Sequence, residues 1–256
     1  MKGGHEGRRY TELASRFILP VMSTRWQEIT AGIAGACVPA GLDLAQPFQV
    51  AWYNTAVDPA YRLPDLGRPR ALGVLVGNTR ALWPHFRAAL RAQPALRDDA
   101  DPLERYTSAC VLAALRPLAE RYAVRWAHDP PPRRVAMQQL GHVSGLAHLS
   151  AGRLNVHPVY GPWIALRAAV VIDADGPPGP PPDPPNPCAD CAHACGPAFE
   201  RAAAALRRRT VDQPGLGDTW DLWLAVRDAC PLGRAHRYGD EQIAYHYRND
   251  RRVLGA

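Results

Sequence analysis

The chain has 256 residues, of which 47% are hydrophobic and 21% are charged, and its formal net charge is +6. Single domains run to about 250 residues, so we expect one main domain. The longest apolar runs, such as Val74–Val76 and Ala168–Ile172, fall far short of the roughly 20 residues of a membrane span. This excludes a membrane partner at the level of the sequence, and the lack of a signal-peptide pattern predicts a cytoplasmic location.

The basic residues are arginines apart from Lys2, and they are scattered along the chain. Nucleic-acid binding usually requires a patch or stripe of Lys and Arg against the phosphates, so we expect no nucleic-acid partner. Arginine also binds both oxygens of a carboxylate at once. Arginine is therefore suited to small ligands that carry carboxylates.

The first predicted elements, in chain order, are a helix, a strand and two further helices. Helical spacing runs from Arg25 to Ile33, and Gly35 and Pro39 predict its end. The β-branched run Arg70–Val76 predicts a buried strand. Helices are expected over Leu82–Ala92 and over Leu103–Tyr122, where Pro117 should kink or split the second one.

The second half of the chain begins with another predicted strand, Trp163–Ile172, in which Arg167 interrupts an apolar run. A buried charge of this kind needs a partner or water. Eight prolines between Pro177 and Pro187 predict a stiff, extended connector. The unit after it should contain helices near Phe199–Arg209 and Trp220–Asp228.

Four segments carry a likeness to a known family: Gln46–Asn54, Gly141–Gly145, His157–Arg167 and Arg237–Tyr245. In this order they resemble segments of the MMACHC (CblC) family of cobalamin-processing proteins. The resemblance implies an α+β fold of the nitroreductase or flavin-reductase kind, with a mixed sheet flanked by helices and a small C-terminal cysteine-bearing module.

The resemblance also implies a division of the chain. Residues 1–21 would form an N-terminal extension, residues 22–176 a cobalamin-binding nitroreductase-like domain, and residues 177–187 the Pro-rich connector. Residues 188–256 would form the cysteine-containing module that completes the pocket.

The activity implied by the resemblance is removal of the upper ligand from a corrinoid bound with its lower base displaced. The ligand would leave by reductive decyanation, by glutathione-dependent dealkylation, or by both, with cobalamin as substrate, glutathione as co-substrate and FMN or FAD as a possible flavin. The product would feed cobalamin trafficking through a downstream cobalamin-dependent enzyme or chaperone, and the chain would be a monomer or homodimer. The alternatives are a cobalamin carrier without turnover and a cobalamin-dependent reductase acting on another substrate.

Site residues are carried over by matching position. Arg167 and Arg227 match arginines that hold the carboxylates of glutathione, and Tyr238 would donate a hydrogen bond nearby. The residues alone leave open an internal ion pair with Asp173 or Asp228. The resemblance implies that the corrin lies against Val135, Ala136, Met137, Gln138, Leu149, Ser150, Ala151, Asn155, His157, Gly161, Trp163 and Leu166.

Many of these corrin-side residues have a plainer interpretation as core packing. Asn155 stands where the animal proteins of the family have a cysteine before the His-Pro step, which puts the same thiol chemistry in question. His142 lies in the family-like segment Gly141–Gly145, but it can also be a core histidine whose ring bonds a backbone carbonyl.

Cys188, Cys191 and Cys195 lie within eight residues, and Cys230 precedes Pro231. Thiols at this spacing favour an iron–sulfur cluster, with zinc, for which His193 could be a ligand, or free thiols as alternatives. The segment resembles the cysteine module of epoxyqueuosine reductases (QueG). A cluster here would deliver electrons to cobalt, whereas Cys37 and Cys110 are expected to be buried structural thiols.

Overall fold

The structure, a computed structural model, describes residues 24–183, 186–208 and 216–255. The expected extension, residues 1–21, lies outside the described residues, as do Pro184 and Pro185 of the connector and Arg209 at the end of a predicted helix. Within the described part of the chain, no helix is both long enough and apolar enough to cross a membrane.

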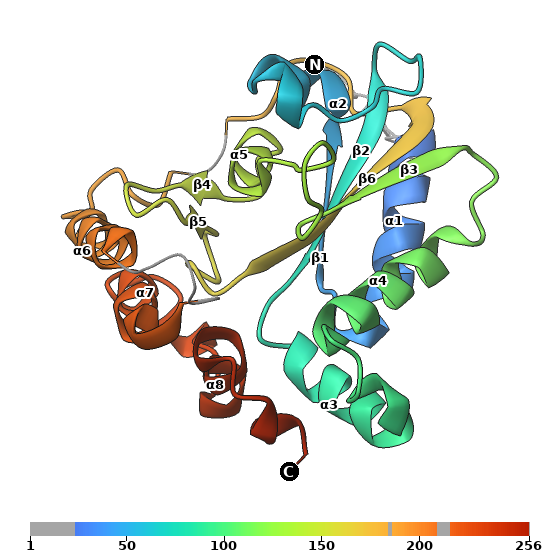
Figure 1. Ribbon diagram of the computed structural model, residues 1–256. Coiled ribbons are helices and arrows are strands. Elements are labelled where there is room, and N and C mark those ends of the chain that lie inside the picture. The colour runs from blue at the N-terminus through green and yellow to red at the C-terminus, as the bar shows by residue number, and fades with distance from the viewer. Residues whose placement is uncertain (1–23, 184–185, 209–215, 256) are drawn as a thin grey trace, which may run out of the picture.

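A four-stranded sheet forms the centre of the molecule, in the order β1-β2-β6-β3 (Figure 1). Its strands are β1 (Leu44–Gln49), β2 (Ala71–Asn78), β3 (Tyr122–Trp126) and β6 (Ala165–Asp175). All three pairings are antiparallel, so the α+β class is confirmed but the expectation of a mixed sheet is corrected. Antiparallel neighbours need no crossover helix between them.

Helices cover both faces of the sheet (Figure 1), which explains why β2 is buried along its whole length. Side chains alternate between the faces of a strand: Val74 packs in the cluster with α1, α3 and α4, and Leu75 packs in the cluster with α2 and α5. These helices are α1 (Arg25–Cys37), α2 (Val50–Thr55), α3 (Leu82–Ala92), α4 (Pro102–Leu115) and α5 (Met137–Val143).

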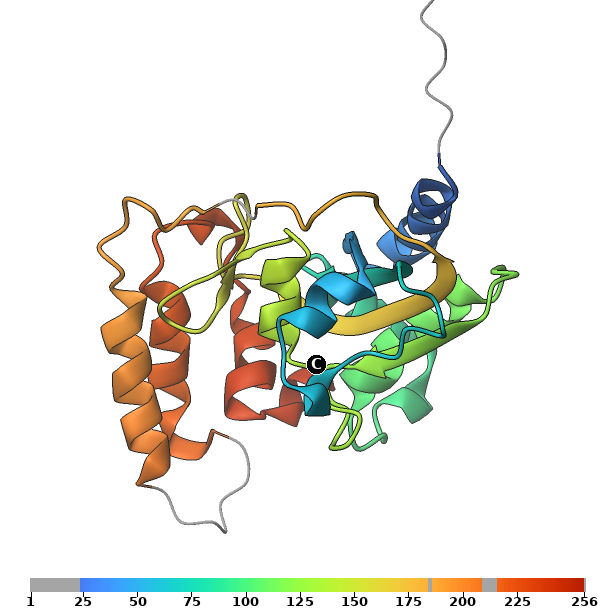
Figure 2. The ribbon, with the colours of Figure 1, turned by 90° about the horizontal axis from the view of Figure 1, so that it is seen from above.

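The last three helices stand together at one side of the molecule, next to the start of β6 (Figures 1 and 2). They are α6 (Cys195–Arg207), α7 (Trp220–Asp228) and α8 (Asp240–Arg248). Leu224 of α7 and Ile243 of α8 pack in one cluster with Trp163, just before β6. The C-terminal helices are therefore docked on the chain that leads into the sheet.

Short segments complete the fold. The connector is held to the end of β1 and to α2 because Gln49 donates a hydrogen bond to the Pro177 carbonyl (2.5 Å) and Trp52 donates one to the Gly179 carbonyl (3.2 Å).

A small two-stranded sheet and six 3-10 turns account for the rest of the regular structure in the described ranges: β4 (His148–Leu149), β5 (Asn155–Val156), Val38–Ala40, Pro59–Tyr61, Pro94–Leu96, Gly217–Thr219, Arg234–His236 and Arg251–Leu254.

The predicted helices over Leu82–Ala92 and Trp220–Asp228 are observed with those bounds. The helix predicted over Leu103–Tyr122 was too long: α4 ends at Leu115, two residues before Pro117, because proline cannot donate the next helical hydrogen bond. Tyr122 instead begins β3. Helix α1 continues through Gly35 to Cys37, since an isolated glycine weakens a helix without ending it.

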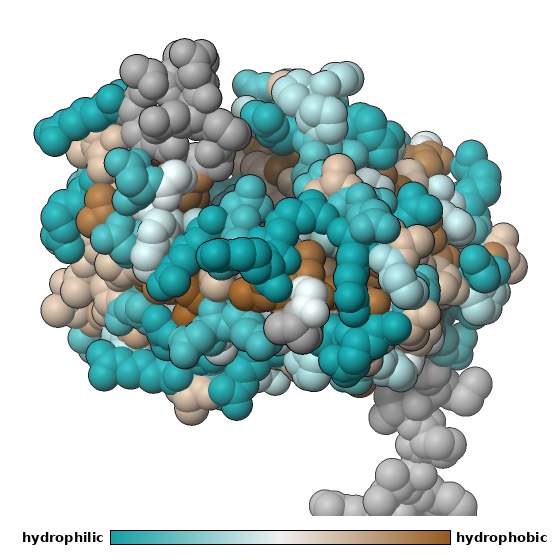
Figure 3. Space-filling view, turned by 60° about the horizontal axis from the view of Figure 1, so that its bottom comes forward, coloured by the Kyte–Doolittle hydropathy of each residue, from teal (hydrophilic) through white to brown (hydrophobic). Residues whose placement is uncertain are grey.

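The surface turned forward in Figure 3 is largely hydrophilic, and hydrophobic side chains show between charged ones rather than as one broad patch. Such a surface is ordinary for a folded domain. The informative features of the molecule are its cavities.

Candidate functional site

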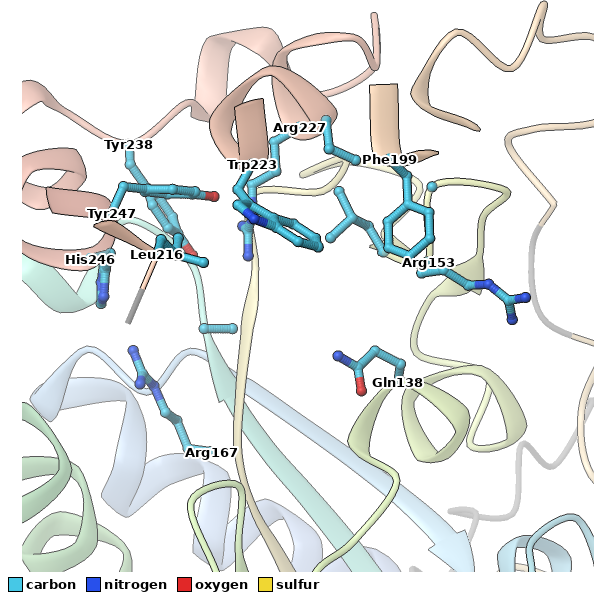
Figure 4. Close-up of a pocket in the computed structure, with 14 residues that line it drawn as sticks. Gln138, Arg153, Arg167, Phe199, Leu216, Trp223, Arg227, Tyr238, His246 and Tyr247 are labelled. Atoms are coloured by element: carbon cyan, nitrogen blue, oxygen red, sulfur yellow. The ribbon is translucent and has the colours of Figure 1, made fainter. Parts of the chain in front are cut away.

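A cavity of about 440 Å³, here called the arginine pocket, lies between the start of β6 and the C-terminal helices (Figure 4). Its volume is within the range of small-molecule sites, about 300–1,000 Å³. The pocket is lined by Gln138, Gly152, Arg153, Leu154, Ala165, Arg167, Phe199, Leu216, Trp223, Val226, Arg227, Tyr238, His246 and Tyr247.

A second cavity of about 330 Å³, here called the strand pocket, adjoins the first. Both pockets are bordered by Gln138, Leu154, Ala165 and Arg227. The rest of the strand pocket is lined by Ala127, Arg134, Val135, Met137, Asn155, Pro162, Ile164 and Leu166.

The backbone of β6 is irregular at Arg167. Ala168 pairs with Val76 of β2, but the next residue of β2, Gly77, pairs with Leu166, so Arg167 is the extra residue of a bulge. A bulge turns a side chain out of the regular alternation of the strand. Gly77 permits the close approach, because a Cβ atom there would lie 2.6 Å from the Ala165 carbonyl oxygen.

The guanidinium of Arg167 has one partner in the fold and one free edge. Its Nε donates a hydrogen bond of 2.7 Å to Oδ1 of Asn78, which is fully buried at the end of β2. Among the described residues, its Nη2 is buried without a hydrogen-bond partner. Burial lowers the pKa of Arg167. A carboxylate from a ligand would satisfy the unpaired nitrogen.

Arg227 of α7 is fixed from two sides. Its Nη1 donates to the Pro162 carbonyl (2.6 Å), and its guanidinium carbon lies 5.8 Å and 5.6 Å from the ring centres of Trp163 and Tyr238. The buried Tyr238 hydroxyl interacts electrostatically with Arg227 but has no hydrogen-bond partner of ordinary geometry within the described ranges. Two cations and a free phenol thus face one pocket.

The structure does not contain the ion pairs of Arg167 or Arg227 with Asp173 or Asp228 that the sequence left open. Asp173 pairs with Arg68 and Arg121 near the far end of β6, and Asp228 pairs with Arg237 at 2.8 Å. Glu104 acts on Arg167 electrostatically, but neither Arg167 nor Arg227 forms an ion pair with an aspartate or glutamate of the described residues. Two buried charges held in this way are costly without a ligand.

Two interlocked glycines hold the loop before β6 against the chain after α7. Gly161 and Gly233 have φ of 57° and 74°, and a Cβ on either would come within 2.2 Å of a carbonyl oxygen, that of Leu232 or Tyr160. Only glycine fits such an approach at positive φ. This contact fixes Arg227 relative to the start of β6.

The corrin-side residues fall into two groups. Val135, Met137, Gln138, Asn155 and Leu166 line the strand pocket, and Asn155 also donates to the Gln138 carbonyl (2.9 Å).

The other predicted corrin-side residues border neither pocket: Ala136, Leu149, Ser150, Ala151, His157, Gly161 and Trp163. Several of them have structural contacts. The Ala136 N–H donates to the Tyr53 hydroxyl, the Leu149 N–H to Nδ1 of His142, and the Ser150 hydroxyl to the Leu154 carbonyl. The partly buried His142 thus accepts a hydrogen bond from the backbone through its Nδ1 atom.

Asn78, the partner of Arg167, was not predicted from the sequence. Neither were several residues that line the arginine pocket: Arg153, Leu154, Phe199, Leu216, Trp223, Val226, His246 and Tyr247. Two signals point to some of them. Gly77 inside an apolar strand is typical of a bulge or close backbone approach. Trp223 lies four residues before Arg227, and therefore on the same face of a helix.

Three of the four clustered cysteines line a further cavity of about 590 Å³, here called the cysteine pocket. They are Cys188, Cys191 and Cys230, and burial raises the pKa of Cys188 and Cys230. Cys195 is buried at the start of α6, where a Cβ on Gly152 would lie 3.2 Å from its Sγ. Because Gly152 lines the arginine pocket, Cys195 packs directly behind that pocket's wall.

Cys188, Cys191, Cys195 and Cys230 do not surround a common point at metal-binding distances in this structure. Over the described ranges, no three Cys, His, Asp or Glu side chains are close enough to hold a metal ion. All six cysteines are free; Cys37 is buried as expected, but Cys110 is partly exposed.

In its fold the chain resembles two kinds of solved structure. It superposes on a Caenorhabditis elegans B12-trafficking protein, CblC, with a TM-score of 0.64 at 19% identity, over 89% of this chain and 94% of that one. An epoxyqueuosine reductase matches with a TM-score of 0.51 at 12% identity, over 89% and 71%. Identities this low establish the fold alone.

Curated relatives extend the likeness to sequence. The chain is 27% identical over 246 residues to a human protein named cyanocobalamin reductase / alkylcobalamin dealkylase, covering 88% of this chain and 79% of that protein. Mouse and cattle proteins of the same name are 26% and 28% identical, and the matches span 60% and 57% of their lengths. No family model matches the chain. These relatives confirm the resemblance to the MMACHC (CblC) family.

Proposed function

We propose that this chain is a cobalamin-processing enzyme that binds a corrinoid base-off against the strand pocket and removes its upper ligand. The arginine pocket would hold glutathione by its carboxylates. The ligand would leave by reductive decyanation, by thiol-dependent dealkylation, or by both, as the names of the curated relatives suggest. The processed corrinoid would pass to a cobalamin-dependent enzyme or chaperone.

The observation that carries the proposal is the pair of buried arginines around a pocket that no acidic residue of the described chain lines. Their uncompensated charge is matched by a ligand with two carboxylates. The adjoining strand pocket would leave the sulfur of such a ligand next to the corrin.

Dealkylation transfers the alkyl group from cobalt to the sulfur of the thiol. The thiol loses its proton to water, the thiolate attacks the carbon bound to cobalt, and the cobalt–carbon bond breaks with its electron pair left on the metal. The thioether forms as cobalt(III) becomes cobalt(I). The protein's own part is to orient the thiol, since alignment of two reactants supplies much of the acceleration in such reactions.

The test compares wild type, Arg167→Ala and Arg91→Ala under nitrogen, with methylcobalamin and glutathione, by visible absorption. Arg91 is an exposed arginine in the last turn of α3 and serves as the matched control. We expect Arg167→Ala to bind corrinoid normally but to lose thiol affinity by roughly 10- to 100-fold, since hydrogen bonds to charged groups contribute about 1.5–3 kcal/mol.

Three results would count against the proposal. If wild type forms no cob(I)alamin or cob(II)alamin with any reductant, the chain is a carrier that hands cobalamin on unchanged. Loss of both thiol and corrinoid binding in Arg167→Ala would mark a structural arginine. Turnover of another substrate that requires bound cobalamin would favour a reductase of the epoxyqueuosine kind.

We further propose that Cys188, Cys191, Cys195 and Cys230 bind a thiophilic metal centre, iron–sulfur or zinc, that supplies electrons to the corrinoid if it is redox-active. Support comes from three cysteines around one pocket and from the fourth behind the arginine pocket. Thiols need not converge before binding, because a metal deprotonates them and draws them together.

This metal proposal predicts bound metal after anaerobic purification. We expect iron with acid-labile sulfide, or one equivalent of zinc, and its loss in Cys191→Ser. Cys110→Ser, on α4 at the other side of the sheet, should keep the metal. Metal-free wild type with four titratable thiols in this segment would contradict the proposal.

The finer expectations stay predictions: the nitroreductase kinship of the fold, the domain boundaries, a flavin, the cytoplasmic location, and the monomer or homodimer. A flavin would be visible as yellow protein whose absorption changes on reduction.

A further inference from the structure

His246 is a histidine of α8 at the charged end of the arginine pocket, and the proposed chemistry leaves it without a role. Figure 4 shows its ring beside the guanidinium of Arg167. The ring packs among aromatic side chains, with centroid distances of 5.4 Å to Tyr245, 5.9 Å to Tyr238 and 6.4 Å to Trp83 of α3. These contacts fix the imidazole while one edge faces the cavity.

The charges that act directly on His246 are positive: Arg167 approaches from β6 and Arg227 from α7. Its ring neighbours include Tyr238 and Tyr245, and burial raises the pKa of Tyr245 to about 12. The carboxylate of Glu104, on α4, acts on Arg167 and Tyr245 but does not line the pocket. Glu241, on the same helix, is occupied elsewhere, since it accepts from Trp83 (3.2 Å) and pairs with Arg87. No carboxylate of the described residues lines the pocket.

This setting keeps the imidazole neutral in the empty protein. Burial, and then the charges of Arg167 and Arg227, lower the pKa of His246 to about 3. The repulsion from the arginines is the part of this effect that a ligand can reverse.

We infer that His246 takes up a proton when a ligand with two carboxylates binds the arginine pocket, and that this third contact selects dianionic ligands. The inference rests on the proposed function, in that the ligand is the anionic thiol. Two carboxylates cancel the charges of the two guanidinium groups. One of them can also accept a hydrogen bond from the imidazolium, and both effects favour the protonated ring.

The direction of the pH dependence follows from linkage. The pKa of His246 is higher in the complex than in the empty protein, so the complex binds more protons. Affinity therefore rises as pH falls, between the pKa in the complex and the pKa of about 3 in the empty protein. The slope has a limit of tenfold per pH unit for one proton.

The experiment measures binding of N-acetyl-S-methylglutathione by calorimetry between pH 6 and 8, in two buffers with different protonation enthalpies. The thiol and the α-amino group of this probe are blocked, and its two carboxylates do not titrate in this range, so proton uptake reports the protein. We expect wild type to gain about three- to tenfold in affinity per unit of falling pH and to take up a sizeable fraction of one proton. The glycine monoethyl ester of the same probe should bind without proton uptake.

Two histidine variants complete the test. His246→Gln should bind the dicarboxylate with no proton uptake and a flat pH profile. His128→Gln, an exposed histidine that stacks on Trp126, should behave as wild type. Thermal unfolding checks each variant, and His246→Asn replaces a Gln variant that does not fold.

The outcomes separate the two proposals. Binding by wild type without proton uptake, or the same uptake in His246→Gln, overturns this inference and leaves the anionic-thiol site standing. Absence of dicarboxylate binding by wild type overturns the site and the inference together. Equal uptake with the monoester overturns the selection of dianions.

Discussion

Arg167 is a residue whose burial is costly to the fold and which the proposed site would use. A charge in a low-dielectric setting requires hydrogen bonds to all its donors, yet one edge of this guanidinium has no partner among the described residues. Natural proteins tolerate such groups at functional sites, where binding repays the cost. The nearest group that orients it is Asn78.

Asn78→Ala should therefore weaken the site without touching the ligand. Arg167 would keep its charge but lose the 2.7 Å hydrogen bond that aims it, and we expect thiol affinity to fall about tenfold, since a hydrogen bond to a charged group contributes about 1.5 kcal/mol or more. Glutathione titrations followed by tryptophan fluorescence would measure this, because Trp223 lines the pocket. Corrinoid affinity, measured in parallel, should not change; an unchanged thiol affinity would show that Asn78 does not position the arginine.

At the scale of elements, the bulge in β6 decides where Arg167 points. In a regular strand, Arg167 would share a face with Ala169 and Val171, and those residues are buried in the core with α2 and α5. The extra residue opposite Gly77 breaks this alternation. Gly77 on the neighbouring strand thus permits the bulge that turns Arg167 toward the pocket.

Gly77→Ala tests this element. The added Cβ would meet the Ala165 carbonyl oxygen at 2.6 Å, so the strands must shift, and overpacking of this kind costs about 1–3 kcal/mol. We expect a lower unfolding temperature and impaired thiol binding.

Gly32→Ala is the matched control for the strand variant. No atom lies within 4 Å of the Cβ position at Gly32, in the middle of α1, so alanine should stabilise the protein by about 0.5–1 kcal/mol. Equal stability of both variants would remove the steric argument for Gly77.

For the whole molecule, the site depends on docking the C-terminal helices against the sheet. The arginine pocket takes Arg167 from β6, Arg227 from α7 and His246 from α8. Elements separated by the Pro-rich connector therefore meet at one cavity. Cys195 packs against Gly152 of the arginine pocket, and the preceding residue, Ala194, lines the cysteine pocket.

Much of the fold was within reach of the sequence. Continuous apolar runs predicted β2 and β6, because strands buried on both faces are apolar throughout, and helical spacing of apolar residues predicted α3 and α7. Positions matched to the family singled out Arg167, Arg227 and twelve corrin-side residues, of which the two arginines and five of the twelve border a pocket. Pro117 predicted a break in the helix over Leu103–Tyr122. The strand β3 after that break and the small elements β4 and β5 were not predicted, since they depend on partners distant in the chain.

The sequence by itself determined which residue types are available: arginines that suit carboxylates, three cysteines within eight residues, and an apolar framework. Only the tertiary structure decided which side chains share a cavity. It left Arg167 bonded to Asn78 rather than to an aspartate, placed His246 beside two arginines, and put Leu149, Ser150 and Trp163 outside the pockets. The physical reason is that helical and strand periodicity records which face of an element is buried, whereas the neighbour on that face is set by how the elements pack.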